Sequence, residues 1–304
     1  MNCQEQCHFS GFFFSGVDPN LFANPQAKWL FQPWSFILYR LILAVYQVVT
    51  LLLLLLVWGE PPYYSLVDDK LKWFTFVSNW AYLLTTIYTV WAFLTTLYWH
   101  INGKKENDAG SYNYDSDLEL KRQYHTGSSS AHLVPTRAKY TPPMPWYFKV
   151  TWFLQVLTCS SEFAVTVFYW VYEYPPEENE LNFFTGNVHG GALFLVVLDF
   201  LMSAHPYRIL HFIYTALFAS AYYVFSYVYY LLDGTSASGN SYIYKDLLDW
   251  ENQPLQTALL AIILIVMGCP PFHFVFCILC ALKMAVAKCC DCCSYDSQRE
   301  GQKA

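Results

Sequence analysis

The chain has 304 residues, of which 55% are hydrophobic and only 13% are charged, and its mean hydropathy is +0.24. A soluble domain has about 25% charged residues, so this composition excludes an ordinary water-soluble protein. The apolar residues also occur in long blocks, as in membrane-spanning helices, which need about 20 mostly apolar residues each. The net charge of −6 says little about orientation in a membrane, because acidic residues hardly influence it.

Six blocks along the chain meet the requirement for a span. They run over residues 34–58, 73–99, 146–172, 188–205, 209–232 and 255–282. Pro206 ends the short fourth block, and Pro270 and Pro271 interrupt the sixth. Trp and Tyr gather at the ends of several blocks, where their polar tips can reach the lipid headgroups. The sequence therefore predicts an all-α membrane protein, a bundle of six transmembrane helices.

The basic residues predict how this bundle is oriented. With the N-terminus in the cytosol, 14 of the 17 Lys and Arg residues fall on the cytosolic side and three on the outer side. Cytosolic loops carry an excess of Lys and Arg, so we expect both termini in the cytosol. No cleavable signal peptide is apparent in residues 1–25. The plasma membrane is favoured over the endoplasmic reticulum.

Five segments follow from this topology. We expect a cytosolic N-terminal segment at 1–33, helices 1 and 2 at 34–99, a flexible cytosolic loop at 100–145, helices 3 to 6 at 146–283 and a Cys-rich cytosolic tail at 284–304. The outer loops are acidic and rich in Tyr, and they are candidate surfaces for protein partners. Nothing points to nucleic acid, to a metal or to a cofactor.

Four cysteines stand just beyond the last span. They are Cys289, Cys290, Cys292 and Cys293. Juxtamembrane cysteines beside basic residues are typical of S-palmitoylation, which we favour here over free thiols. A zinc site that also uses Cys277 and Cys280 is disfavoured, because this second pair lies in apolar sequence.

Charged side chains inside the membrane are costly, and each is a candidate for a function. Glu162 and Asp199 are predicted to lie about 16–18 Å below the outer surface, at 1.5 Å per helical residue. Either they form hydrogen bonds that clamp helices together, or they serve a proton relay or a polar cavity. Arg40 lies near the inner end of its helix, where its side chain can extend to the surface.

A polar turn follows the fourth block at the predicted inner surface. His205, Arg208 and His211 surround Pro206 there, and an interfacial or structural role is favoured for them.

A hydroxyl and an imidazole are predicted to meet near the outer surface. Thr75 and Asn79 fall on the first two turns of the second block, four residues apart on one face. His189 falls on the first turn of the fourth block, at a similar depth. A histidine that takes the hydroxyl proton is the minimum for nucleophilic catalysis. A capping or packing role for Thr75 is the alternative.

Several motifs carry a resemblance to a known family. They are His189 at the start of a span, Asp199 within it, the turn with Pro206, Arg208 and His211, the outer segment from Tyr242 to Trp250, and KWFTFVSNW before the second span. This pattern resembles the protein rolling stone family, over residues from about 28 to 280 outside the 100–145 loop. The resemblance implies a multi-pass membrane protein and a role such as myoblast fusion or adhesion.

A more distant similarity is to the androgen-induced intramembrane hydrolases. That similarity implies hydrolysis of fatty-acid esters of hydroxy fatty acids by a threonine and a histidine, at the positions of Thr75 and His189. Three hypotheses remain open: a membrane protein that acts in fusion or adhesion, an intramembrane hydrolase with a lipid-ester substrate and Asn79 as a supporting residue, and a transporter that uses Glu162 and Asp199. All three place the protein in the lipid bilayer.

Overall fold

The computed structural model describes residues 12–27, 32–103, 143–174 and 181–301, except residues 62, 64, 66, 68 and 246, and describes side chains as far as residue 287. Throughout these ranges the chain forms helices and isolated β-bridges, without a β-strand. Nearly all of the loop expected at 100–145 lies outside the described residues. The same holds for the side chains of Cys289, Cys290, Cys292 and Cys293.

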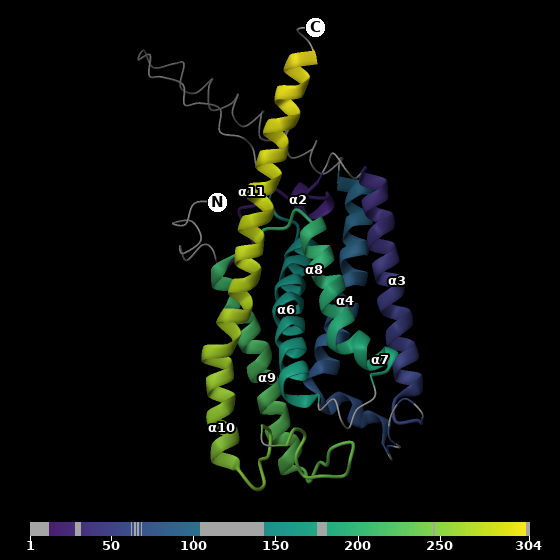
Figure 1. Ribbon diagram of the computed structural model, residues 1–304, viewed down its shortest axis with the longest axis vertical. Helices are drawn as coiled ribbons and strands as arrows, with labels where there is room; N and C mark the ends of the chain where they lie inside the picture. The colour runs from purple at the N-terminus through teal and green to yellow at the C-terminus, as the bar shows by residue number, and fades with distance from the viewer. Residues whose placement is uncertain are drawn as a thin grey trace, which may run out of the picture.

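Six helical stretches in the described residues are long and apolar enough to cross a membrane (Figure 1). The first three are Pro33–Val57 (α3), Val77–Gly103 (α4, Val77–Tyr98, and η3, Trp99–Gly103) and Trp146–Glu173 (α6, Trp146–Phe168, and η4, Tyr169–Glu173). The fourth, Phe183–Met202, joins α7 (Phe183–Gly186), η5 (Asn187–Gly191) and α8 (Ala192–Met202). The last two are Ile209–Leu231 (η6, Ile209–His211, and α9, Phe212–Leu231) and Pro254–Ala287 (α10, Pro254–Ile263, η7, Leu264–Gly268, and part of α11, Cys269–Gly301). The predicted six-helix membrane fold is confirmed.

The bundle has two distinct ends (Figure 1). One end carries the short helix α2 (Asn20–Ala23) and the turn between α8 and α9. The opposite end carries the 3₁₀ helix η2 (Lys70–Thr75), α7 and the segment between α9 and α10. We call them the α2 end and the η2 end.

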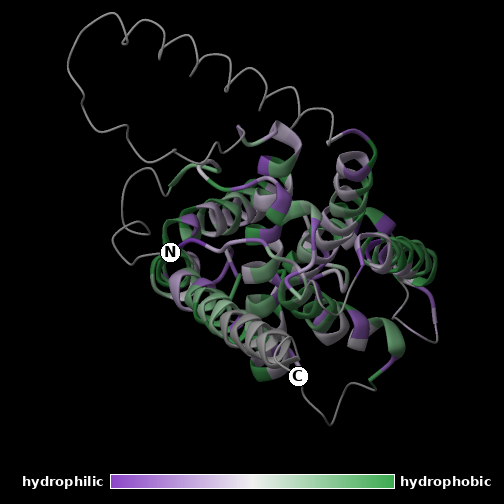
Figure 2. Cartoon of the chain, turned by 90° about the horizontal axis from the view of Figure 1, so that it is seen from above, coloured by the Kyte–Doolittle hydropathy of each residue, from purple (hydrophilic) through white to green (hydrophobic). Residues whose placement is uncertain are grey.

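The helices differ in how much of their surface is buried. In its most apolar window, the span of α6 has 61% of its residues buried and the span of α4 has 50%, whereas the last span has only 11%. Seen from above, hydrophobic residues predominate along the helices (Figure 2). α4 and α6 therefore form the centre of the bundle, and the last span offers most of its surface to lipid.

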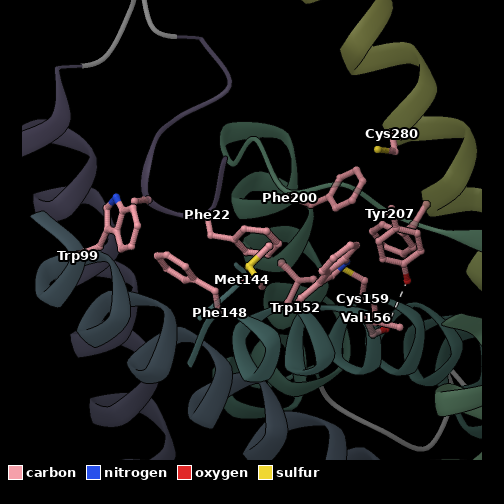
Figure 3. Packing of buried hydrophobic residues seen from close by; sticks show 13 residues of the cluster. Phe22, Trp99, Met144, Phe148, Trp152, Val156, Cys159, Phe200, Tyr207 and Cys280 are labelled. Carbon is pink, nitrogen blue, oxygen red and sulfur yellow. Dashed lines mark hydrogen bonds between the residues drawn. The ribbon is translucent and has the colours of Figure 1, made fainter. Parts of the chain in front are cut away.

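The largest hydrophobic cluster lies at the α2 end (Figure 3). Phe22 of α2 is fully buried there, with its ring 5.5 Å from that of Phe148 and 5.4 Å from that of Trp152. The segment after α2 is fixed by a hydrogen bond from the Gln26 N–H to the Met202 carbonyl, 2.7 Å long. The N-terminal segment thus packs onto the α2 end of the transmembrane helices.

The second span begins later than the sequence predicts. η2 is capped by Asp69, whose side chain accepts a hydrogen bond from the Leu71 N–H, and Phe76 then takes an extended conformation. α4 starts at Val77, so Thr75 is not on its first turn and does not share a helical face with Asn79. The expected i to i+4 relation of these two residues is wrong, because the extended Phe76 separates their helices.

Several spans contain wider π-helical turns. η5 precedes α8, and η7 precedes Pro270 and Pro271 in the last span. A proline cannot donate the backbone hydrogen bond that an α-helix requires, and a wide turn ahead of it keeps the helix continuous. The prolines therefore do not break the last span, which runs from Pro254 to Ala287. α8 ends at Met202, and Ser203 then takes an extended conformation.

Candidate functional site: a cavity at the η2 end

A cavity of about 300 Å³ extends from the middle of the bundle towards the η2 end. The start of α4, the second half of α6 with η4, η5 and α9 form most of its wall. Most lining side chains are apolar or aromatic, the aromatic ones being Trp58, Phe76, Phe168, Tyr169, Phe218, Tyr222, Tyr223, Tyr244 and Phe272. An apolar cavity of this size is at the lower end of the range for small-molecule sites.

A few polar side chains interrupt this apolar wall. Ser78 and Asn79 come from α4, Glu173 from the end of η4, His189 from η5, and Tyr244 from the segment after α9. The hydroxyl of Tyr244 accepts a hydrogen bond from the Val77 N–H, 3.1 Å long. Burial raises the pKa of Tyr244 above its usual value, so this hydroxyl keeps its proton.

His189 is held at the cavity by two consecutive residues of η4. Its ring is stacked on that of Tyr169, with the centroids 3.5 Å apart and the planes at 3°. Its backbone carbonyl accepts a hydrogen bond of 2.8 Å from the indole N–H of Trp170. The Nδ1 atom of His189 has no hydrogen-bond partner among the described residues. The imidazole is therefore fixed in orientation, and its Nδ1 is buried without a partner among the described residues.

Thr75 lies beside this cavity, in the wall behind its lining. Its hydroxyl donates a hydrogen bond of 2.7 Å to the Lys72 carbonyl, and its own carbonyl accepts one of 2.7 Å from the Tyr222 hydroxyl. No hydrogen bond joins the described side chains of Thr75 and His189. Their segments nevertheless pack together, since Trp73 and Val188 belong to the same buried cluster.

Asn79 and Ser78 are better placed towards the cavity than Thr75. One amide hydrogen of Asn79 bonds to the Trp73 carbonyl at 2.7 Å, which closes the turn between η2 and α4. Ser78 lines the cavity and interacts with the Tyr244 hydroxyl. Sequence reasoning missed Ser78, Glu173 and Tyr244, although Tyr244 lies in a motif that it had noted. Nothing local in the sequence marks these residues as neighbours.

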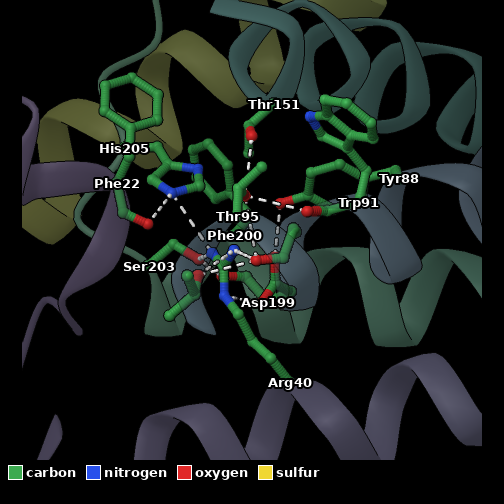
Figure 4. Close-up of polar contacts among 12 residues, drawn as sticks. Phe22, Arg40, Tyr88, Trp91, Thr95, Thr151, Asp199, Phe200, Ser203 and His205 are labelled. Carbon is green, nitrogen blue, oxygen red and sulfur yellow. Dashed lines mark hydrogen bonds and ion pairs between the residues drawn. The ribbon is translucent and has the colours of Figure 1, made fainter. Parts of the chain in front are cut away.

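Glu162 and Asp199 are buried in the bundle, and neither lines the cavity. Glu162 accepts a hydrogen bond of 2.6 Å from the Thr85 hydroxyl of α4. Asp199 accepts one of 2.5 Å from the Tyr88 hydroxyl, and its other oxygen lies 3.9 Å from Nε of Arg40 (Figure 4). Each carboxylate thus connects its own helix to α4.

Arg40 is almost fully buried, instead of extending to the membrane surface as its position near a helix end suggests. Its guanidinium donates to the Ala92 carbonyl at 3.0 Å and to the Ser203 hydroxyl at 2.9 Å (Figure 4). Lys283 is also buried and donates to three backbone carbonyls, those of Phe200, Ser203 and His205. The three carbonyls that Lys283 contacts lie at and beyond the C-terminus of α8, and the Ser203 hydroxyl that Arg40 contacts lies just beyond it. Both cations therefore stabilise the end of that helix.

The polar turn between α8 and α9 is covered by the N-terminal segment. The guanidinium of Arg208 donates to the carbonyls of Phe13 and Ser15, and burial lowers its pKa from the usual value. The ring of His205 stacks on Phe22 at 4.6 Å, and burial, followed by the charge of Arg40, holds the pKa of His205 well below its usual value. His211 is fully buried, with its ring centroid 4.4 Å from that of Phe14.

Comparison with known proteins identifies the family. The sequence profile described as "Protein rolling stone" matches residues 128–292, a range that contains His189 but not Thr75. "Protein rolling stone" of Drosophila melanogaster is 26% identical over 183 residues, which are 60% of this chain and 57% of that protein. The chain therefore spans less than two thirds of the length of this relative. No solved structure matches the chain. Because the family profile covers more than half of its residues, the chain belongs to the rolling stone family.

Proposed function

We propose that the protein hydrolyses lipid esters within the membrane, in the cavity that extends to the η2 end. The observation that carries this proposal is the imidazole of His189, which lines an apolar cavity with Nδ1 unpaired among the described residues. Histidine is the most frequent general base, and an apolar cavity suits an acyl chain. The distribution of basic residues predicts that this end faces away from the cytosol.

Thr75 is the proposed nucleophile. In the resting arrangement its hydroxyl bonds to the Lys72 carbonyl, so it must change rotamer before it can act. A change of about 120° in χ1 separates staggered rotamers, and such a change requires no movement of the backbone. The hydrogen bond from Tyr222 to the Thr75 carbonyl keeps the backbone in place beside the cavity.

The proposed reaction has two steps. In the first, the Thr75 oxygen attacks the ester carbonyl carbon while His189 takes the hydroxyl proton, and His189 then gives this proton to the departing alcohol. In the second, His189 takes a proton from water, which attacks the acyl-threonine and releases the fatty acid, and Thr75 recovers its proton. The second amide hydrogen of Asn79 is the proposed donor to the oxyanion.

The direct test is hydrolysis of a panel of lipid esters by purified protein. Thr75→Ala removes the nucleophile and should abolish turnover through the acyl-enzyme. His189→Ala should lower kcat by about 100-fold or more, because general acid–base catalysis contributes at least that much. Thr75→Ser should keep part of the activity, since it retains the hydroxyl. Folded wild-type protein that cleaves none of the esters would contradict the proposal.

Ser78→Ala is the matched control, because Ser78 carries a hydroxyl that already lines the cavity. Its activity should stay close to that of the wild type. If Ser78→Ala is inactive while Thr75→Ala turns over normally, the nucleophile is Ser78 and the assignment of Thr75 is wrong.

A role in cell–cell fusion or adhesion is the second candidate, and membership of the rolling stone family favours it. Lipid hydrolysis would change the membrane in which fusion takes place, so the two functions are compatible. Cells that express His189→Ala at normal surface level should then fuse less than cells with the wild type. Normal fusion with this variant would separate the family role from the cavity.

Glu162 and Asp199 are assigned to helix clamping in this proposal, ahead of transport. Their hydrogen bonds to Thr85 and Tyr88 support this assignment. Proton flux in liposomes that depends on either carboxylate would favour a transporter.

A further inference from the structure

The rim of the cavity carries a carboxylate that the proposed hydrolysis does not use. Glu173 is the last residue of η4, lines the cavity and is exposed. The cavity therefore reaches the protein surface beside it. Among the described lining residues, Glu173 is the one Asp, Glu, Lys or Arg. A ligand that enters here meets one negative charge and, in the lining, no Lys or Arg to balance it.

Aromatic side chains accompany this carboxylate. Tyr169 lies four residues earlier, about one helical turn deeper in the cavity wall, and it is the residue on which His189 stacks. The Tyr244 phenol also lines the cavity, and the negative charge of Glu173 is among the smaller causes, after burial, that raise the pKa of Tyr244. Aromatic rings combined with negative charge form the usual environment of a quaternary ammonium group.

The net charge of the segments that connect spans at this end has the same sign. By sequence, the segments that connect spans at this end are residues 58–76, 174–182 and 232–253, and they contain ten acidic and three basic residues. An excess of negative charge raises the local concentration of cations and repels anions. Fatty-acid esters of hydroxy fatty acids, which the distant similarity implies, end in a carboxylate. That carboxylate would meet the like charge of Glu173.

We propose that the ligand of the cavity is a fatty-acyl ester of an ammonium-bearing alcohol. The ammonium group binds at Glu173 between Tyr169 and Tyr244, the ester group lies beside His189, and the acyl chain occupies the apolar part of the cavity. Glu173 and His189 belong to the lining of the same cavity, so one ligand that fills the cavity can meet both side chains. Binding of this ligand is independent of catalysis, whereas its cleavage rests on the proposed hydrolysis.

The first experiment measures binding without turnover. The probe is the ether analogue of dodecanoylcholine, 2-(dodecyloxy)ethyl-trimethylammonium, with wild-type protein in nanodiscs and with empty nanodiscs to correct for partitioning. Its neutral isostere, 3,3-dimethylbutyl dodecyl ether, has the same shape without the charge. The cationic ether should bind about tenfold more tightly, as one favourable ammonium–aromatic site with a carboxylate allows. Equal affinities for the two ethers would overturn the assignment.

The charge at Glu173 is tested by a pair of variants. Glu173→Gln should abolish the preference for the cationic ether, and it should fold normally because Glu173 is exposed. Glu251→Gln removes an exposed acid from the same end but outside the cavity, and the preference should persist. If the preference survives in Glu173→Gln, or disappears in Glu251→Gln, it comes from the general surface charge. Either result would contradict a site at Glu173.

Two further probes test whether the acyl chain is needed and whether the charge must be positive. Tetramethylammonium, which lacks the chain, should displace the ether only weakly; if it competes equally well, the ligand is a soluble cation and the lipid assignment fails. Dodecyloxyacetate, an anionic amphiphile, should bind more weakly than the neutral ether. Tighter binding of dodecyloxyacetate would contradict the proposal.

Hydrolysis distinguishes this inference from the proposed function. If the cationic ether binds through Glu173 but dodecanoylcholine is not cleaved, the ligand assignment stands and the hydrolase proposal fails. If dodecanoylcholine and 3,3-dimethylbutyl dodecanoate are cleaved with equal KM, and Glu173→Gln changes neither value, the hydrolase proposal stands and the ligand assignment is overturned.

Discussion

The imidazole of His189 lies flat against the phenol ring of Tyr169, with the two ring centroids 3.5 Å apart and the planes at 3°. The next residue, Trp170, holds the His189 backbone through its indole N–H. Consecutive residues of the π-helical η4 therefore fix both the ring and the main chain of the same histidine. This arrangement determines which edge of the imidazole faces the cavity.

Tyr169 should act as a positioning residue for His189. Tyr169→Phe keeps the aromatic face, so kcat for ester hydrolysis should stay within about twofold of the wild type. Tyr169→Leu removes the stack, which contributes about 0.5–1.5 kcal/mol, and kcat should fall by up to about tenfold. Steady-state kinetics with a neutral ester check this, because a neutral ester does not depend on the ammonium contact proposed for Tyr169. A similar loss in both variants would show that the hydroxyl matters more than the stack.

Arg40 should be essential for stability. Arg40→Met leaves the buried carboxylate of Asp199 without its cationic neighbour, and breaking a buried pair costs about 3–5 kcal/mol. The midpoint of thermal unfolding in detergent should fall strongly. Lys149→Met is the matched control, because Lys149 is exposed and its removal should change the midpoint little.

The partnership with Asp199 is tested by the double variant. Arg40→Met with Asp199→Leu removes both charges, so its loss of stability should be smaller than the sum of the two single losses. Additive losses would mean that the two side chains act independently.

His205 should make the protein sensitive to acid. Its pKa in the folded state is held well below the usual value of about 6.5, so below pH 6.5 the unfolded chain binds a proton that the folded protein excludes. Stability is then lost as the pH falls, by at most about 1.4 kcal/mol per pH unit from this one residue. The difference between the thermal unfolding midpoints at pH 7.5 and pH 5.5 should be smaller in His205→Gln than in the wild type. The same pH difference in both proteins would contradict this role.

Phe22 should anchor the N-terminal segment. Its ring is fully buried, and Phe22→Ala should cost about 3–5 kcal/mol in unfolding free energy, the range for a large-to-small change in a core. Limited proteolysis of the N-terminal segment should also become faster. Phe13→Ala is the control, because 51% of the Phe13 side chain is exposed and its carbonyl can still accept from Arg208.

Composition and block length sufficed to predict the six spans, because crossing hydrocarbon imposes a length and an apolarity that any spanning helix must have. The same reasoning identified Glu162 and Asp199 as residues that need a partner. It did not supply the partners, since Arg40 lies 159 positions before Asp199 and its own place near a helix end suggested the surface.

Local geometry at Thr75 was beyond sequence reasoning for a different physical reason. Apolar residues continue through 73–76, but Asp69 caps the start of a separate 3₁₀ helix, and the extended Phe76 ends that helix before α4 begins. Because Phe76 is extended, the side chains before it no longer share a face with the side chains of the helix that follows. The position of His189 in the cavity depends in turn on Tyr169, which no motif in the sequence connects to it.

Mass spectrometry of the acyl-enzyme is the most direct test of Thr75 as the nucleophile. Purified protein is mixed with an activated p-nitrophenyl ester of dodecanoic acid, quenched in acid and digested. A dodecanoyl adduct should form on Thr75 in the wild type and be absent from His189→Ala. An adduct on Ser78, or steady hydrolysis of the ester without an adduct on Thr75 at any time point, would contradict this assignment.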